Sequence, residues 1–168
     1  MLTCGALWRK VGDDGEQCEK PPFGAYVMFL GEYEHNIDQK GRLAIPARFR
    51  NAFAEGLVVA QGFDRCIMVF PTARFKEWAE EINNHPLTNS NARRLNRAIF
   101  SAAFFLDLDG QGRVTLPARL RDYANVGNSV MVAGLYDHLE VWARDSWEGE
   151  RALMDEQLWQ IAEANPVR

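Results

Sequence analysis

The sequence predicts an α+β fold built from two tandem copies of one small unit. Residues 36–50 and 107–121 are identical at seven of their fifteen aligned positions, which indicates an internal duplication. Both copies carry the same order of patterns, namely strand, turn, strand, short helix and hairpin. Without its trailing helix each copy has only about 45 residues, near the size at which an independent core fails. We therefore expect the two copies to pair and to share one hydrophobic core.

The composition is that of a globular chain. If the protein binds nucleic acid, its positive charge must be concentrated on one part of the surface. Hydrophobic residues make up 47% of the 168 residues and charged residues 25%, which is ordinary for a globule of one domain or two intimate halves. The net charge of -4 excludes a protein that coats nucleic acid through overall basicity. The three cysteines form no Cys-x-x-Cys pair, so we expect free thiols in the cytoplasm. No apolar run approaches the roughly 20 residues of a membrane span.

The first copy follows a polar extension at residues 1–27, which is interrupted by Pro21 and Pro22 and is expected to be disordered. We assign residues 28–82 to this copy, including its trailing helix. Pro46 is expected to start the short helix, because proline suits the first helical position. The expected elements are strands at 29–37, 42–45, 56–60 and 66–70 and helices at 47–53 and 72–82.

The second copy repeats this order over residues 104–144, after a connecting helix at 83–103. Its short helix again follows a proline, Pro117. Residues 145–168 are expected to form a C-terminal helix and tail. Four apolar side chains of that helix are expected to pack inward, namely Trp147, Leu153, Leu158 and Ile161.

Three alternative roles for the repeated turn fit the residues poorly. The acidic spacing of the second turn resembles a calcium loop, but Ala118, like Ala47 in the first copy, stands where a bidentate glutamate is required. The turn glycines do not precede a helix, which argues against a phosphate-cradling loop. The histidines do not recur between the copies, and the adjacent Asp137 and His138 are not expected to face each other as a catalytic pair. We therefore expect no metal ion, no cofactor and no enzymatic activity.

The remaining role is a cationic turn that binds a polyanion. Basic residues exceed acidic ones by three within residues 36–50 and by one within residues 107–121. Arginine has a planar fork that suits phosphate oxygens and the guanine edge. An aspartate four residues earlier can accept backbone N–H groups and hold that fork in place. On the residues alone, a surface ion pair that only closes the turn explains the pattern equally well.

The paired Asp-x-x-x-Arg motifs at residues 38–42 and 109–113 resemble those of the MraZ family of bacterial transcriptional regulators. The likeness covers nearly all of residues 28–164 and includes Met-Phe-x-Gly, Asp-x-Lys-Gly-Arg-Leu-x-Ile-Pro-x-Arg-Phe-Arg and the central Arg-Arg pair. The resemblance implies an AbrB-like, swapped-hairpin fold in which the two copies interlock into one β-barrel with flanking helices. It also implies a closed homo-oligomeric ring of about eight to twelve subunits.

The same resemblance implies that the turns bind repeated boxes of double-stranded DNA upstream of the protein's own gene. The protein would then repress the cell-division and cell-wall gene cluster, as a cytoplasmic and nucleoid-associated regulator with no membrane partner and no small-molecule substrate. Arg42 and Arg113 would contact DNA, oriented by the aspartates, with Lys40 helping at the first turn. The implied DNA-binding residues are Asp38, Lys40, Gly41, Arg42, Arg48, Asp109, Gly112, Arg113 and Arg119. The alternative is a ring-forming protein–protein interaction module that does not bind DNA.

Overall fold

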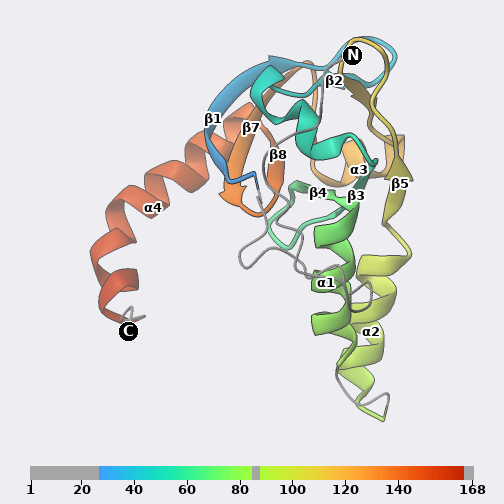
Figure 1. Cartoon of the computed structure of the whole chain (residues 1–168). Coiled ribbons are helices and arrows are strands. Elements are labelled where there is room, and N and C mark those ends of the chain that lie inside the picture. Colours follow the sequence, from blue (N-terminus) through green and yellow to red (C-terminus); the bar gives the residue numbers. More distant parts are fainter. Residues whose placement is uncertain (1–26, 85–87, 165–168) are drawn as a thin grey trace, which may run out of the picture.

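An antiparallel sheet of six strands forms the centre of the structure, and both copies contribute strands to it (Figure 1). The computed structural model describes residues 27–84 and 88–164, so nearly all of the predicted extension at 1–27 lies outside the described residues. The strand order is β1-β7-β8-β4-β3-β5, and a separate two-stranded ribbon pairs β2 with β6.

Most elements lie close to the predicted positions, but the connecting helix predicted at 83–103 is shorter, and covers Ser90–Phe100. The strands are β1 (Phe29–Asn36), β2 (Arg42–Ala44), β3 (Leu57–Gln61), β4 (Ile67–Pro71), β5 (Phe104–Leu106), β6 (Arg113–Thr115), β7 (Ser129–Tyr136) and β8 (Leu139–Ala143). The helices are the 3₁₀ helix η1 (Ala47–Phe53) and the α-helices α1 (Thr72–Asn83), α2 (Ser90–Phe100), α3 (Ala118–Tyr123) and α4 (Arg144–Ala164).

Both faces of the central strands are apolar because both are covered. Alternate residues of a strand point to opposite faces, so Val59 and Val69 enter the main core while Met68 enters a second cluster. Phe75 of α1 and Trp147 of α4 belong to that second cluster. Burial on both faces explains why β3 and β4 are continuous apolar runs instead of alternating ones.

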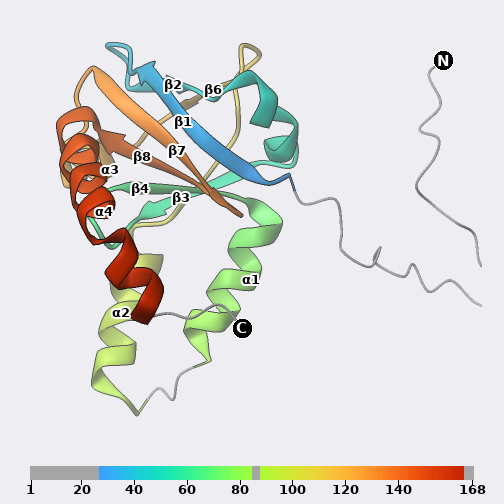
Figure 2. The same cartoon turned by 90° about the vertical axis from the view of Figure 1, so that its left-hand side faces the viewer.

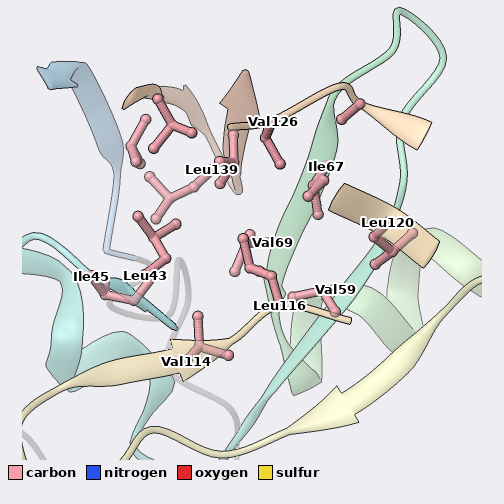
Figure 3. Packing of buried hydrophobic residues seen from close by; sticks show 14 of the residues in the cluster. Leu43, Ile45, Val59, Ile67, Val69, Val114, Leu116, Leu120, Val126 and Leu139 are labelled. Carbon is pink, nitrogen blue, oxygen red and sulfur yellow. The ribbon is translucent and has the colours of Figure 1, made fainter. Parts of the chain in front are cut away.

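Strand exchange between the copies builds the main core. β1 of the first copy pairs along its whole length with β7 of the second, and β5 of the second pairs with β3 of the first. In the ribbon, Leu43 lies opposite Val114. Side chains from both copies, including Leu43, Val69, Val114 and Leu139, meet in one cluster (Figure 3). The prediction of a shared core is therefore confirmed.

The described strands do not close into the β-barrel that the family resemblance implied. The six-stranded sheet has two edges, β1 and β5, which are not hydrogen-bonded to each other. β1 instead continues through a single bridge, between Ile37 and Leu43, into the ribbon. β5 has only three residues and leads by a turn into β6. The ribbon therefore connects the two edges in place of direct pairing between them.

The helix starts follow local sequence signals. Pro46 and Pro117 are the N-cap residues of η1 and α3, with ψ of 130° and 137°, so each lies one position before the first helical residue, the place predicted for it. The helix predicted at 47–53 is a 3₁₀ helix, the tighter form common in short connectors. The side chain of Asn89 caps α2 by accepting the backbone N–H groups of Asn91 and Ala92.

Helix α4 packs through its first turns only and then projects away from the body (Figures 1 and 2). Trp147 is buried beside Trp142. Leu153, Leu158 and Ile161 are 50%, 65% and 47% exposed, so the prediction that they pack inward is wrong. The later turns of the helix extend beyond the sheet (Figure 1), which leaves these apolar side chains about half exposed or more. Within the described residues, no helix is both long enough and apolar enough to span a membrane.

The ribbon core can be tested with one buried and one exposed substitution. Leu43 is fully buried, so Leu43→Ala is expected to lower the free energy of unfolding by about 2–5 kcal/mol. Thr115 lies on the exposed face of the same ribbon, so Thr115→Ala is expected to change it by less than about 0.5 kcal/mol. Denaturant unfolding at one protein concentration measures both. Equal losses for the two variants would contradict the assigned faces.

Candidate nucleic-acid interface

The ribbon of β2 and β6 presents one face to the core and the other to solvent. Leu43 and Val114 lie opposite each other and are both fully buried. Because side chains alternate along a strand, Arg42 and Arg113 lie on the other face. Arg42 pairs with Thr115, two residues from Arg113. The two arginines are therefore diagonal neighbours, with Cα atoms about 7–8 Å apart.

The first turn (residues 38–42) is closed by one carboxylate. Asp38 Oδ1 accepts the backbone N–H groups of Lys40 and Arg42, both at 2.9 Å. Oδ2 accepts Nε and Nη2 of the Arg42 side chain, both at 2.7 Å. The backbone N–H of Gly41 donates to the Asp38 carbonyl at 2.9 Å, and Gly41 has a φ of +76° that favours glycine.

The second turn (residues 109–113) repeats this network bond for bond. Asp109 Oδ1 accepts the backbone N–H groups of Gln111 and Arg113 at 2.9 and 3.0 Å. Oδ2 accepts Nε and Nη2 of Arg113, both at 2.8 Å. Gly112 has a φ of +74°, matching Gly41. The expectation that the aspartate holds the arginine in a fixed pose is therefore confirmed in both copies.

Each held arginine keeps one free edge. Nε and Nη2 are taken by the aspartate, while Nη1 of Arg42 and of Arg113 has no hydrogen-bond partner among the described residues. The two side chains are 29% and 26% exposed. Lys40 is exposed at the first turn, where the second turn has Gln111. The two turns therefore share a geometry but differ in charge.

The donors around each aspartate keep it ionised. The backbone N–H of Arg42 lowers the pKa of Asp38, and the Arg42 guanidinium adds to this effect. The side chain and backbone N–H of Arg113 lower the pKa of Asp109 to about 2. Because the pKa is lower in the folded state, the resulting stabilisation is present above the unfolded pKa and is lost as the pH falls through the folded pKa.

Arg48 and Arg119 lie outside these two networks. Both are exposed residues of the short helices η1 and α3. Nη1 of Arg48 donates to the Tyr33 hydroxyl at 2.9 Å, and Nη1 of Arg119 donates to the Ser101 carbonyl at 3.1 Å. Within the part of the chain that the structure describes, neither side chain hydrogen-bonds to a residue of either turn, so both stand outside the Asp–Arg networks.

Two further arginines adjoin the turns and were absent from the candidate residues. Arg121 lies against Gly41 and Arg50 lies against Gly112, so each turn is touched by an arginine of the other copy. Both arginines are identical between the repeats and contribute to the local positive charge. These signals do not single them out from the other arginines of the repeats. Their contacts depend on the pairing of β2 with β6, which the sequence pattern does not reveal.

Asp137 and His138 do meet, contrary to the prediction. Nδ1 of His138 lies 2.5 Å from Asp137 Oδ1. Tyr136 adopts a φ of 65°, which turns the chain sharply between β7 and β8. Arg74 of α1 also binds Asp137 at 2.7 Å, and the His138 ring stacks on Phe70. This cluster ties α1 to the β7–β8 hairpin.

The ionised turn can be tested by titration. The Asp109 carboxyl is expected to titrate at a pH of about 2, so the turn stays closed throughout the neutral range. Arg113→Gln removes the main cause of the shift and is expected to raise the pKa of Asp109 toward its ordinary value. Carboxyl carbon chemical shifts in NMR report both values. An unshifted Asp109 in the unaltered protein would rule out the closed network.

Comparison with known protein families agrees with the duplication. A family model described as "MraZ protein, putative antitoxin-like" matches the chain twice, over residues 28–98 and 99–164. Each match contains one Asp-x-x-x-Arg turn. The duplicated unit inferred from the sequence is therefore the unit of this family.

Relatives from several bacteria match over most of the chain. A protein of Roseiflexus castenholzii is 48% identical over 128 residues, which cover 76% of this chain and 90% of the relative. A protein of Dehalococcoides mccartyi is 44% identical over 137 residues, or 81% and 96% of the two chains. One from Natranaerobius thermophilus is 38% identical over 136 residues, or 81% and 95%. Each bears the name Transcriptional regulator MraZ. The chain described here belongs to the MraZ family.

Proposed function

We propose that this protein is a sequence-specific DNA-binding transcriptional regulator. It binds repeated operator boxes upstream of its own gene and represses the cell-division and cell-wall gene cluster. One observation carries the proposal: two matched turns each hold an arginine, with a free edge, on the solvent face of one ribbon. A free guanidinium edge suits phosphate oxygens and the guanine edge. The same pose recurs in both copies on one solvent face, which supports a shared binding role.

The shape of the ribbon supports double-stranded DNA as the partner. The major groove admits a two-stranded β-ribbon, whose side chains can then reach base edges. The proposed contact residues are those of the two turns, Asp38, Lys40, Gly41, Arg42, Asp109, Gly112 and Arg113, with Arg48 and Arg119 on the adjoining short helices. The aspartates act by orienting the arginines, since a carboxylate repels phosphate.

In this proposal, a homo-oligomer combines the weak DNA contacts of its single subunits. The net charge of -4 gives one subunit little overall attraction for DNA. A ring of about eight to twelve copies presents many turns at once, and avidity then multiplies the small contributions. In this proposal the exchange of strands between the copies is the swapped-hairpin arrangement of AbrB-like folds. The ring acts in the cytoplasm on the nucleoid, without a cofactor, an enzymatic reaction or a membrane.

A second function is favoured by the exposed side of α4. Leu158, Trp159 and Ile161 are 65%, 75% and 47% exposed on the projecting helix. Exposed apolar patches mark protein contacts. A ring-forming interaction module that uses these residues and does not bind DNA is therefore the competing function.

Arg42→Ala tests the proposal while leaving the fold intact. The variant is expected to weaken binding to the region upstream of the gene by more than about tenfold for each engaged turn, so that multivalent binding is lost. Arg94→Ala is the matched control, because Arg94 is an exposed arginine of α2, and α2 lies at the opposite end of the molecule from β2 (Figure 1). Mobility shifts measure binding, and size exclusion checks assembly. Unchanged affinity in Arg42→Ala would refute a DNA contact at the first turn.

Salt separates the two candidate functions. Binding through several cation–phosphate contacts must weaken steeply as salt rises, because bound counterions are released from DNA. The affinity of the unaltered protein for the same DNA fragment is therefore expected to fall by orders of magnitude between low and moderate salt. An absence of DNA binding at low salt, with assembly intact, would favour the interaction module.

A further inference from the structure

Each turn is covered by an arginine from the opposite copy. A Cβ atom built on Gly41 would lie 3.0 Å from Nε and Cζ of Arg121, and one built on Gly112 would lie 2.5 Å from Cδ of Arg50. Both glycines are favoured by their positive φ, and a side chain at either position would have to displace the covering arginine. Each turn is closed by its own aspartate, but its glycine is covered by a residue of the other copy.

Equivalent hydrogen bonds hold Arg121 and Arg50 in place beside the two turns. Nε of Arg121 donates to the Leu116 carbonyl at 3.1 Å, and the backbone N–H of Leu116 donates to the Gly41 carbonyl at 2.9 Å. In the mirror arrangement, Arg50 donates to the Ile45 carbonyl at 2.9 Å, and the N–H of Ile45 donates to the Gly112 carbonyl at 3.0 Å. The hydrogen bonds of Nε hold each arginine side chain beside a turn, and the terminal nitrogens take no part in these hydrogen bonds.

The covering arginines supply charge that the held arginines do not. Arg42 and Arg113 are each neutralised by their own aspartate. Among the ion pairs of residues 27–84 and 88–164, Arg50 and Arg121 have no carboxylate partner. Each adds an uncompensated positive charge beside a turn whose own Asp–Arg pair is neutral. Such charges are suited to phosphate oxygens.

We propose that each DNA-contacting turn is a composite of both copies, in which Asp38–Arg42 is completed by Arg121 and Asp109–Arg113 is completed by Arg50. The inference rests on the proposed DNA binding and assigns different roles to the two arginines of each unit. The carboxylate-held arginine presents a fixed edge to the bases, and the covering arginine binds a phosphate. With Lys40, the first composite unit carries more positive charge than the second, so it makes the stronger phosphate contact.

Salt dependence tests the phosphate contact. Arg121→Gln and Arg50→Gln are each expected to weaken binding to the upstream DNA fragment about tenfold. Each is also expected to reduce the slope of log affinity against log salt by about 0.9 for every engaged subunit. Arg121→Lys, which keeps the charge, is expected to retain the slope. Arg94→Gln removes the same charge far from the turns and is expected to leave the slope unchanged.

A double-mutant cycle tests the pairing across the copies. Asp38→Asn loosens Arg42 without removing it. Combined with Arg121→Gln it is expected to be clearly non-additive, because both changes act on one unit. Arg50→Gln acts on the other unit. The affinity loss of the Asp38→Asn, Arg50→Gln double variant is therefore expected to equal the product of the two single losses within about twofold.

The outcomes separate this inference from the proposed function. If the unaltered protein does not bind the DNA fragment at low salt, the proposed function fails. If it binds but Arg50→Gln and Arg121→Gln keep the unaltered slope, with folding confirmed by circular dichroism, only the phosphate role fails. If Asp38→Asn couples equally to both glutamine variants, or couples only to Arg50→Gln, the composite units are wrong.

Discussion

Pairing between β2 and β6 is the interaction on which the rest of the structure depends. It places Leu43 opposite Val114 in the core that both copies share. A copy that kept its own strands together would be near the size at which an independent core fails. The same pairing sets the solvent face of the ribbon, and with it the positions of Arg42 and Arg113. Stability and the candidate interface therefore arise from one set of contacts.

Within that frame, each turn is fixed by a local network that needs few residues. One aspartate satisfies two backbone N–H groups and holds one guanidinium, and one glycine supplies the positive φ. Holding the arginine in advance reduces the entropy that binding would otherwise cost. It also neutralises the arginine, which makes the pair better suited to directional recognition than to bulk electrostatic attraction. Attraction must then come from neighbouring cations, and the structure places Lys40, Arg50 and Arg121 there.

Much of this arrangement could be predicted from the sequence because it is encoded locally. The Asp–Gly–Arg spacing determines each turn, prolines mark the starts of η1 and α3, and strict repetition identifies the shared unit. The failures concern long-range geometry. The contact of Arg121 with Gly41 requires the cross-copy register, and the meeting of Asp137 with His138 depends on the positive φ of Tyr136. Apolar periodicity in α4 predicted burial, but the helix extends past the surface that could have covered Leu158.

The central claim is that both turns of one ribbon face DNA. Site-specific photocrosslinking tests it directly, with a crosslinking residue placed at the exposed positions 40 and 111 and, as a reference, at 94 in α2. The account predicts crosslinks to the upstream DNA from positions 40 and 111 and none from position 94. Crosslinks at position 94 alone, or none at either turn in a complex that forms normally, would contradict it.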